Sequence, residues 1–408
     1  MKVLVYTHAF APKIGGAETY VMLLAGGLTQ QSDGAGRQAA VVTVATPTPA
    51  GEMNDSSLPF RVIRRPSLRT LLGLMCNADV VHLAGPCLLP MLLGLALRKR
   101  VVVEHHGYQA ICPNGLLFYE PTKTVCPGHF MARRYRKCLQ CEATTVGWVK
   151  STIELLLAFP RRWACKKVSL NLPISHHVRK RVRLPRTRVV YYGIPDLEQR
   201  VKPFREERAD PGLSGATFAY VGRLVKEKGL PVLFQAVRQL KSAGRDFRLK
   251  IIGDGPERAN LEEFAVSLGI DSKVSFTGRL QGDALQSLLQ DVSVVVMPTL
   301  MEETAGLAVM EQMMRGRIVI ASDIGGLSEV VDDAGLKFAP GDAAGLASCL
   351  QRVLDDPSLR ELLGKKARER ALRLFSQDRM VAEHLAVYQP PSAADLQKSV
   401  IRGTEPNA

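Results

Sequence analysis

Two glutamates, Glu303 and Glu311, stand in the stretch of sequence whose residue types most suggest chemistry. An apolar strand is expected at residues 293–297, followed by a loop and a helix that begins near Ala305 or Gly306. The free N–H groups and the dipole at such a helix start favour a diphosphate. Because a helix rises about 1.5 Å per residue, the two carboxylates are expected on the order of 10 Å apart. That separation suits a clamp along an extended ligand, although such a pair alone is more often part of a solvated helix face.

Other residues that could bind an anion lie in loops after expected strands. Arg223 and Lys228 stand in the stretch Gly-Arg-Leu-Val-Lys-Glu-Lys-Gly, after an expected strand at residues 217–221. Gly253 begins Gly-Asp-Gly-Pro-Glu, and Arg279 ends Phe-Thr-Gly-Arg. Two further pairs occur in the first half of the chain: Gly15 with Gly16, and His106 with Gly107. Taken alone, a glycine pair indicates only a turn, and a histidine is more often structural.

Together, these segments resemble the family 4 retaining glycosyltransferases, which have the GT-B fold. The Glu303-x7-Glu311 pair is similar to the E-x7-E motif of that family, and the other segments follow in the family's order over nearly the whole chain. The resemblance implies an α/β protein in which two doubly wound, Rossmann-like domains face a cleft. It also implies an enzyme that transfers a hexose from a nucleoside-diphosphate sugar with retention of configuration and needs no cofactor for catalysis.

The resemblance implies a role for each matching residue. Arg223 and Lys228 would neutralise the leaving diphosphate, since both side chains carry a positive charge. Glu303 would hold the donor sugar, and His106 would contact that sugar near its reacting face, which completes the expected catalytic set. The expected donor-binding residues are Gly15, Gly16, Gly253, Arg279, Ala305, Gly306, Leu307 and Glu311. Ala305 replaces an aromatic residue of the family, which leaves the shape of the sugar pocket open.

The elements that must position these residues alternate apolar, β-branched runs with helical stretches, as in parallel α/β sheets. Strands are expected at residues 2–6, 40–45, 80–83, 101–104, 167–171, 188–191, 217–221, 249–252, 274–277, 293–297 and 318–321. Residues 195–215 are polar and indicate a linker, so domains are expected at 1–197 and 198–372, with ligands at the carboxyl ends of the strands. A helix at 373–389 would cross back to the first domain, and the tail at 390–408 is expected to be disordered.

Most of the net charge of +15 lies in one stretch. Residues 131–188 hold 15 basic and two acidic residues, interleaved with apolar residues such as Trp148, Ile153 and Trp163. This combination suits a helix on an anionic membrane surface, and about equally a core-facing helix with a solvated basic back. Nucleic acid is not expected as a partner, because no helix-turn-helix, zinc-finger or RNP signal is present.

Composition and segment lengths favour a cytosolic enzyme. The 408 residues are 46% apolar and 23% charged, which excludes collagen-like, disordered, coiled-coil and polytopic membrane classes. The longest uncharged apolar stretch, residues 84–97, is too short to span a bilayer. The first ten residues lack the features of a signal peptide, so none is expected.

Four of the eight cysteines fall in an expected loop at residues 107–141. Their spacing is C-x13-C-x11-C-x2-C, and they are Cys112, Cys126, Cys138 and Cys141. Four thiols in one long loop suggest a structural zinc site, with a redox pair or bare thiols about equally favoured. Stable disulfides are not expected in the cytosol.

Other functions were weighed against glycosyl transfer. A dinucleotide-dependent oxidoreductase is excluded, because Arg258 replaces the third glycine of the Gly-x-Gly-x-x-Gly pattern. A basic membrane- or nucleic-acid-binding module that has lost catalysis, and a GT-B nucleotide-sugar epimerase, stay as alternatives. The expected partners are a UDP-sugar donor, a glycan or polyprenyl-linked acceptor and an anionic membrane surface. These partners suggest polysaccharide or glycolipid synthesis at the inner face of the plasma membrane.

Overall fold

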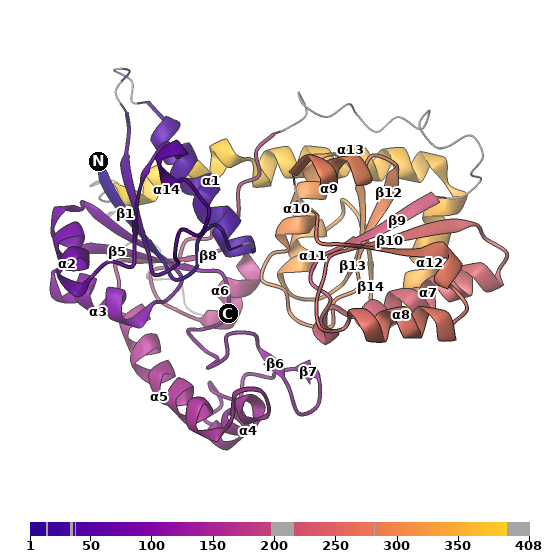
Figure 1. Ribbon diagram of the computed structural model, residues 1–408, viewed down its shortest axis with the longest axis horizontal. Helices are drawn as coiled ribbons and strands as arrows, with labels where there is room; N and C mark the ends of the chain where they lie inside the picture. Colours follow the sequence, from indigo (N-terminus) through magenta and orange to yellow (C-terminus); the bar gives the residue numbers. More distant parts are fainter. Residues whose placement is uncertain (14, 33–35, 37, 197–215, 281, 390–408) are drawn as a thin grey trace, which may run out of the picture.

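The computed structural model describes residues 1–13, 15–32, 36, 38–196, 216–280 and 282–389. Two six-stranded parallel sheets, each accompanied by helices, form two domains that lie side by side (Figure 1). The strand orders are β3-β2-β1-β4-β5-β8 and β11-β10-β9-β12-β13-β14, so the two sheets share one doubly wound topology. The expected α/β fold with two Rossmann-like domains is confirmed.

The first domain begins with β1 and ends with α6. Its strands are β1 (Lys2–Thr7), β2 (Val41–Thr46), β3 (Arg61–Arg64), β4 (Val80–Ala84), β5 (Arg100–His105), β8 (Leu170–Pro173) and the antiparallel pair β6 (Phe118–Tyr119) and β7 (Thr124–Val125). Its helices are α1 (Gly16–Gln30), α2 (Leu68–Asn77), α3 (Leu88–Ala96), α4 (Tyr135–Val146), α5 (Trp148–Cys165) and α6 (His176–Val182).

The second domain begins with β9. Its strands are β9 (Ala216–Val221), β10 (Phe247–Ile252), β11 (Val274–Gly278), β12 (Val292–Met297), β13 (Ile318–Ser322) and β14 (Leu336–Phe338). Its helices are α7 (Leu230–Ser242), α8 (Arg258–Ser267), α9 (Gly282–Leu288), α10 (Leu307–Met314), α11 (Gly325–Val331), α12 (Ala343–Asp355) and α13 (Pro357–Phe375). Every residue of β13 is buried, as expected for a strand of a parallel sheet covered on both faces.

Several of the observed strands differ from the expected ones. The short strands β3 and β14 were not expected, because four and three residues carry too little periodicity to be recognised. The expected strand at residues 188–191 is wrong. That segment runs beside β8, but only Thr187 forms a bridge, to Asn171, and Pro173 has no N–H with which to continue the ladder.

The expected loop at residues 107–141 is also partly wrong, because it contains β6, β7 and the start of α4. Cys138 and Cys141 therefore lie on a helix. Most of the expected linker, residues 197–215, and the expected disordered tail, residues 390–408, lie outside the described residues.

The last helix, α14 (Gln377–Tyr388), returns to the first domain and lies against α1 (Figure 1). The side chain of Gln377 donates to the carbonyl of Leu23 at 2.8 Å, and Arg100 donates to the carbonyl of Val387 at 2.9 Å. Of the helices described, none combines the length and apolar character needed to cross a bilayer.

Candidate functional site

The loop between β12 and α10 is the centre of the candidate site. Strands β9 and β12 are neighbours, so the loops at their carboxyl ends meet. There the ammonium of Lys228 forms an ion pair with the carboxylate of Glu303, and each side chain is only 14% exposed. Two residues 75 positions apart that were expected in the catalytic set are thus in direct contact.

The start of α10 has the features expected of an anion site. Helix α10 begins at Leu307, one residue after the expected start, because Gly306 adopts the left-handed backbone and provides no side-chain cap. Among the described residues, the N–H groups of Leu307 and Ala308 have no hydrogen-bond acceptor. They are therefore free for an anionic ligand.

The glycine loop of the first domain faces this helix start. A Cβ built on Gly16 would lie 3.9 Å from Cδ2 of Leu307, so the amino-terminal ends of α1 and α10 approach each other across the two domains. Gly15 caps α1 without a side-chain hydrogen bond. The structure thus brings two expected donor-binding residues together from opposite domains.

The loop is fixed from behind by the start of α11. The N–H of Gly326 donates to the carbonyl of Glu303 at 2.7 Å. A Cβ at Gly326 would lie 2.1 Å from the carbonyl oxygen of Thr304, so only glycine permits this contact. Gly253 has a similar structural role, since a Cβ there would lie 1.8 Å from the carbonyl oxygen of Gly222.

Four other expected residues of this domain make fewer polar contacts. Arg223 and Arg279 are exposed, and within the described parts of the chain neither side chain has a hydrogen bond or ion pair. Glu311 lies inside α10, where burial raises the pKa of its carboxyl while Arg315 opposes that effect. The buried Ala305 contributes no polar side chain.

The same loop connects the two domains through several hydrogen bonds. The hydroxyl of Ser175 donates to the carbonyl of Thr304 at 2.6 Å, and the hydroxyl of Thr304 donates to the carbonyl of His106 at 3.0 Å. Arg181 lies 2.9 Å from the carboxylate of Glu302. Burial opposes the ionisation of Glu302, but His177 and Arg181 outweigh it, and the pKa of Glu302 is lowered.

A second contact between the domains involves Glu329 of α11. Its carboxylate accepts hydrogen bonds from the N–H groups of His176 and His177, at 2.8 and 2.7 Å, at the start of α6. It also accepts one from the hydroxyl of Tyr191 at 2.5 Å. One carboxylate of the second domain thus binds two backbone amides and a phenol of the first.

His106 lies at the junction of the domains, but its ring is turned inward. Its Nδ1 lies 2.8 Å from the hydroxyl of Tyr192, and its Nε2 lies 3.5 Å from the carboxylate of Glu104. The side chain is 10% exposed, and burial lowers its pKa to about 4. Both ring nitrogens therefore face protein groups. Its role toward the donor sugar stays a prediction.

Glu104 belongs to a buried polar cluster that sequence reasoning missed. Its Oε2 lies 3.3 Å from Nε2 of His82, and its Oε1 lies 3.9 Å from Nε2 of His384 on α14. These three side chains form a group whose ligand atoms are close enough to hold a metal ion. The hydroxyl of Tyr388 lies 3.0 Å from Nδ1 of His82. Burial lowers the pKa of His82 to about 3 and raises that of Glu104.

The four cysteines of the expected metal site are buried free thiols. Cys138 interacts electrostatically with the other three, so they form one cluster, and Cys141 accepts a hydrogen bond from the N–H of Glu120 at 3.4 Å. In the described structure, no three of these sulfurs lie mutually within 4.8 Å. Zinc bound by thiolates brings sulfurs to about 3.8 Å, so they would have to converge on an ion. The zinc site stays a prediction.

Comparisons of sequence match most of the second half of the chain to a known protein family. Residues 204–370 match the family model described as "Glycosyl transferases group 1". The 2-deoxystreptamine glucosyltransferase of Streptomyces kanamyceticus is 40% identical over 150 residues, which cover 36% of this chain and 38% of that protein. The chain thus spans well under half the length of this curated relative.

Comparisons of structure extend over nearly the whole chain. HepE from Anabaena, solved in complex with UDP, superimposes with a TM-score of 0.68 at 18% identity, covering 95% of this chain and 100% of that one. The lipopolysaccharide outer core galactosyltransferase WaaB superimposes with a TM-score of 0.61 at 16% identity, covering 95% and 99%. The chain therefore has the GT-B fold, and its residues 204–370 match the group 1 glycosyltransferases.

Proposed function

We propose that this protein is a retaining glycosyltransferase that uses a UDP-sugar. The observation that carries the proposal is the arrangement of Lys228 and Glu303 beside the uncapped start of α10, with Gly16 facing it from the other domain. In this proposal the donor diphosphate lies against the free amides of α10. Lys228 and Arg223 neutralise the charge that develops as the diphosphate leaves.

The relatives support this choice of reaction and donor. The curated relative from Streptomyces kanamyceticus is a glucosyltransferase, and HepE was solved with UDP and with UDP-glucose. In the proposal, Glu303 exchanges its ion pair with Lys228 for the hydroxyls of the donor sugar, and Glu311 binds the ribose. Arg279 and Gly253 complete the donor site, and catalysis requires no metal.

The acceptor is proposed to be a glycan or a polyprenyl-linked saccharide, in the synthesis of a cell-surface polysaccharide or glycolipid. A cytoplasmic protein held at the inner face of the plasma membrane would meet such an acceptor. The uneven charge of the first domain, with 15 basic and two acidic residues between positions 131 and 188, supports this location.

Release of UDP from UDP-sugars, followed with and without candidate acceptors, tests the proposal. Lys228→Ala is expected to lower turnover about 100-fold or more, as loss of one preorganised charge donor typically costs about 3 kcal/mol in the transition state. Lys226→Ala is the matched control, because that exposed lysine belongs to the same 3-10 turn. An epimerase would instead convert the free sugar nucleotide without an acceptor. Equal turnover in both variants would contradict the assignment of Lys228.

A further inference from the structure

Helices α4 and α5, with the turn before them, form a projecting hairpin over residues 130–167, here termed the α4–α5 hairpin. The two helices pack on each other and are joined at Gly147, and they extend from the sheet of the first domain (Figure 1). Helix α5 buries one face through Ser151, Leu155 and Ala158. Its opposite face is exposed, because nothing in the described structure covers it.

That opposite face is apolar along its whole length. Val149 is 78% exposed and Leu156 is 62% exposed, although both are aliphatic. The exposed apolar side chains of α5 are Trp148, Val149, Ile153, Leu156, Leu157, Phe159 and Trp163. Positions 149, 153, 156 and 163 follow the helical period, so they form one ridge about 21 Å long at ~1.5 Å per residue.

Positive charges border the ridge. Residues 130–167 contain nine basic and two acidic residues. One acid, Glu154, lies 3.7 Å from Arg161, and the pKa of the other, Glu142, is raised by burial. The free charge around the ridge is therefore strongly positive.

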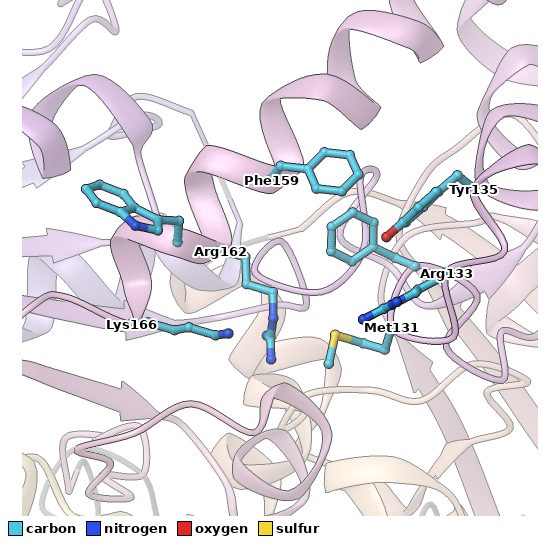
Figure 2. A pocket seen from close by; sticks show the side chains of 8 residues that line it. Met131, Arg133, Tyr135, Phe159, Arg162 and Lys166 are labelled. Atoms are coloured by element: carbon cyan, nitrogen blue, oxygen red, sulfur yellow. The ribbon is translucent and has the colours of Figure 1, made fainter.

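A cavity of about 390 Å³ lies beside the ridge, and both apolar and positively charged side chains line it. Phe130 and Phe159 pack with ring centroids 5.2 Å apart and form an aromatic wall. Figure 2 shows Arg133, Arg162 and Lys166 directed toward the same space. Arg162 also donates to the carbonyl of Val182 at 3.0 Å, whereas Arg133 and Lys166 have no side-chain partner among the residues described.

We propose that the α4–α5 hairpin docks on an anionic phospholipid bilayer, with the ridge of α5 in the interface and a lipid phosphate in the cavity. An exposed apolar helix face flanked by cations is the pattern of interfacial helices, whereas nucleic acid would leave the aliphatic ridge in water. The apolar wall of the cavity suits acyl carbons beside the phosphate, and its three cations suit the phosphate charge. Docking needs no sugar donor, so it can be measured apart from glycosyl transfer.

Tryptophan fluorescence provides a direct test. Both tryptophans of the chain, Trp148 and Trp163, lie exposed on α5. Vesicles of phosphatidylglycerol and phosphatidylcholine are expected to shift the emission to shorter wavelength, and brominated acyl chains are expected to quench it. Phosphatidylcholine alone is expected to bind far more weakly, and added salt is expected to weaken binding to the anionic vesicles.

Matched variants separate the two contributions. Leu156→Asp is expected to lower partitioning about 10-fold or more, since it removes apolar burial. The control is Val266→Asp, at an exposed apolar position on α8. Arg133→Gln combined with Lys166→Gln is expected to lower partitioning about 30-fold, at roughly 5-fold for each cation. Lys365→Gln with Arg373→Gln, two exposed cations of α13, is the control.

Several outcomes would overturn the proposal. Equal binding to anionic and neutral vesicles would exclude the role of the cations. Absence of any spectral shift would exclude insertion of α5. Self-association of the wild-type chain that Leu156→Asp abolishes, without vesicle binding, would assign the ridge to a second copy. Each variant must keep the far-UV circular dichroism spectrum and the melting temperature of the wild type, which shows that it is folded whether or not the chain binds UDP.

Discussion

The hydrogen bonds of Glu329 predict how the closed arrangement of the two domains is stabilised. The carboxylate accepts two backbone N–H bonds and one phenolic O–H bond from the first domain. Hydrogen bonds to a charged group contribute about 1.5–3 kcal/mol each. A glutamine at this position keeps one acceptor oxygen but places an NH₂ group against a donor. Glu329→Gln is therefore expected to lose the bond from one amide and, because the charge is removed, to weaken the other two, at a total of about 3 kcal/mol or more of closure free energy.

This loss corresponds to a decrease of roughly 100-fold or more in the ratio of closed to open molecules, at about 1.4 kcal/mol per tenfold change. The other contacts between the domains, such as Ser175 with Thr304, persist. Small-angle X-ray scattering is expected to show a larger radius of gyration for Glu329→Gln. Donor turnover is expected to fall, because the α1 and α10 ends belong to different domains and their approach depends on the contacts between those domains.

Tyr191→Phe is the matched control for this prediction. It removes one of the three bonds and leaves the charged carboxylate with its two amide donors, so closure is expected to weaken by only about 1.5–3 kcal/mol. The order of the effects, with Glu329→Gln larger than Tyr191→Phe, follows from the geometry. Scattering and turnover of Glu329→Gln equal to those of the wild type would refute the reasoning.

Three further predictions concern stability and metal binding. Four histidines have a pKa that burial lowers to about 4 or below (His82, His105, His106 and His384), so they stay neutral in the folded chain to about pH 4 but bind protons near pH 6.5 when unfolded. The free energy of unfolding should therefore fall as the pH decreases from 6.5 toward 4, by about 1.4 kcal/mol per pH unit for each histidine. Glu104 has a raised pKa, so its protonation changes the free energy of unfolding in the opposite direction, but it is one group against four. Urea midpoints equal at pH 7.5 and 5.5 would contradict this prediction. Gly326→Ala should destabilise by several kcal/mol through its clash with Thr304, whereas Gly73→Ala, in a helix with open space around it, should not; equal melting temperatures would contradict the contact. If the cysteine cluster holds zinc, Co²⁺ should give thiolate charge-transfer absorption that a Cys138→Ser variant loses, and an unchanged spectrum would exclude the site.

The sequence predicted those features of the candidate site that residues close together in the chain determine. Helix α10 begins one residue from the expected position, because the segment before it supplies a glycine at the cap and an apolar period after it. The contact between Lys228 and Glu303 is consistent with the strand order, since both residues lie in loops that follow the adjacent strands β9 and β12. Such positions can be predicted without knowing side-chain packing.

Contacts between distant elements could not be predicted in this way. The cluster around Glu104 assembles His82, His106 and His384 from three separate segments, and a single acid in an apolar strand was the one available signal. The hydrogen bonds from the first amides of α6 to Glu329 likewise depend on how the two domains pack on each other. The expected strand at residues 188–191 failed because periodicity does not report that the neighbouring Pro173 lacks an N–H.

Calorimetric titration of the chain with UDP, in the presence of EDTA, tests the central claim most directly. The donor site predicts binding without metal, and a Kd that Arg223→Ala raises about 10- to 100-fold, since a hydrogen bond to a charged group contributes about 1.5–3 kcal/mol. Arg238→Ala, an exposed position on α7, should leave the Kd unchanged. Failure of UDP to bind, or equal binding by wild type and Arg223→Ala, would contradict the assignment of the candidate site to a nucleotide-sugar.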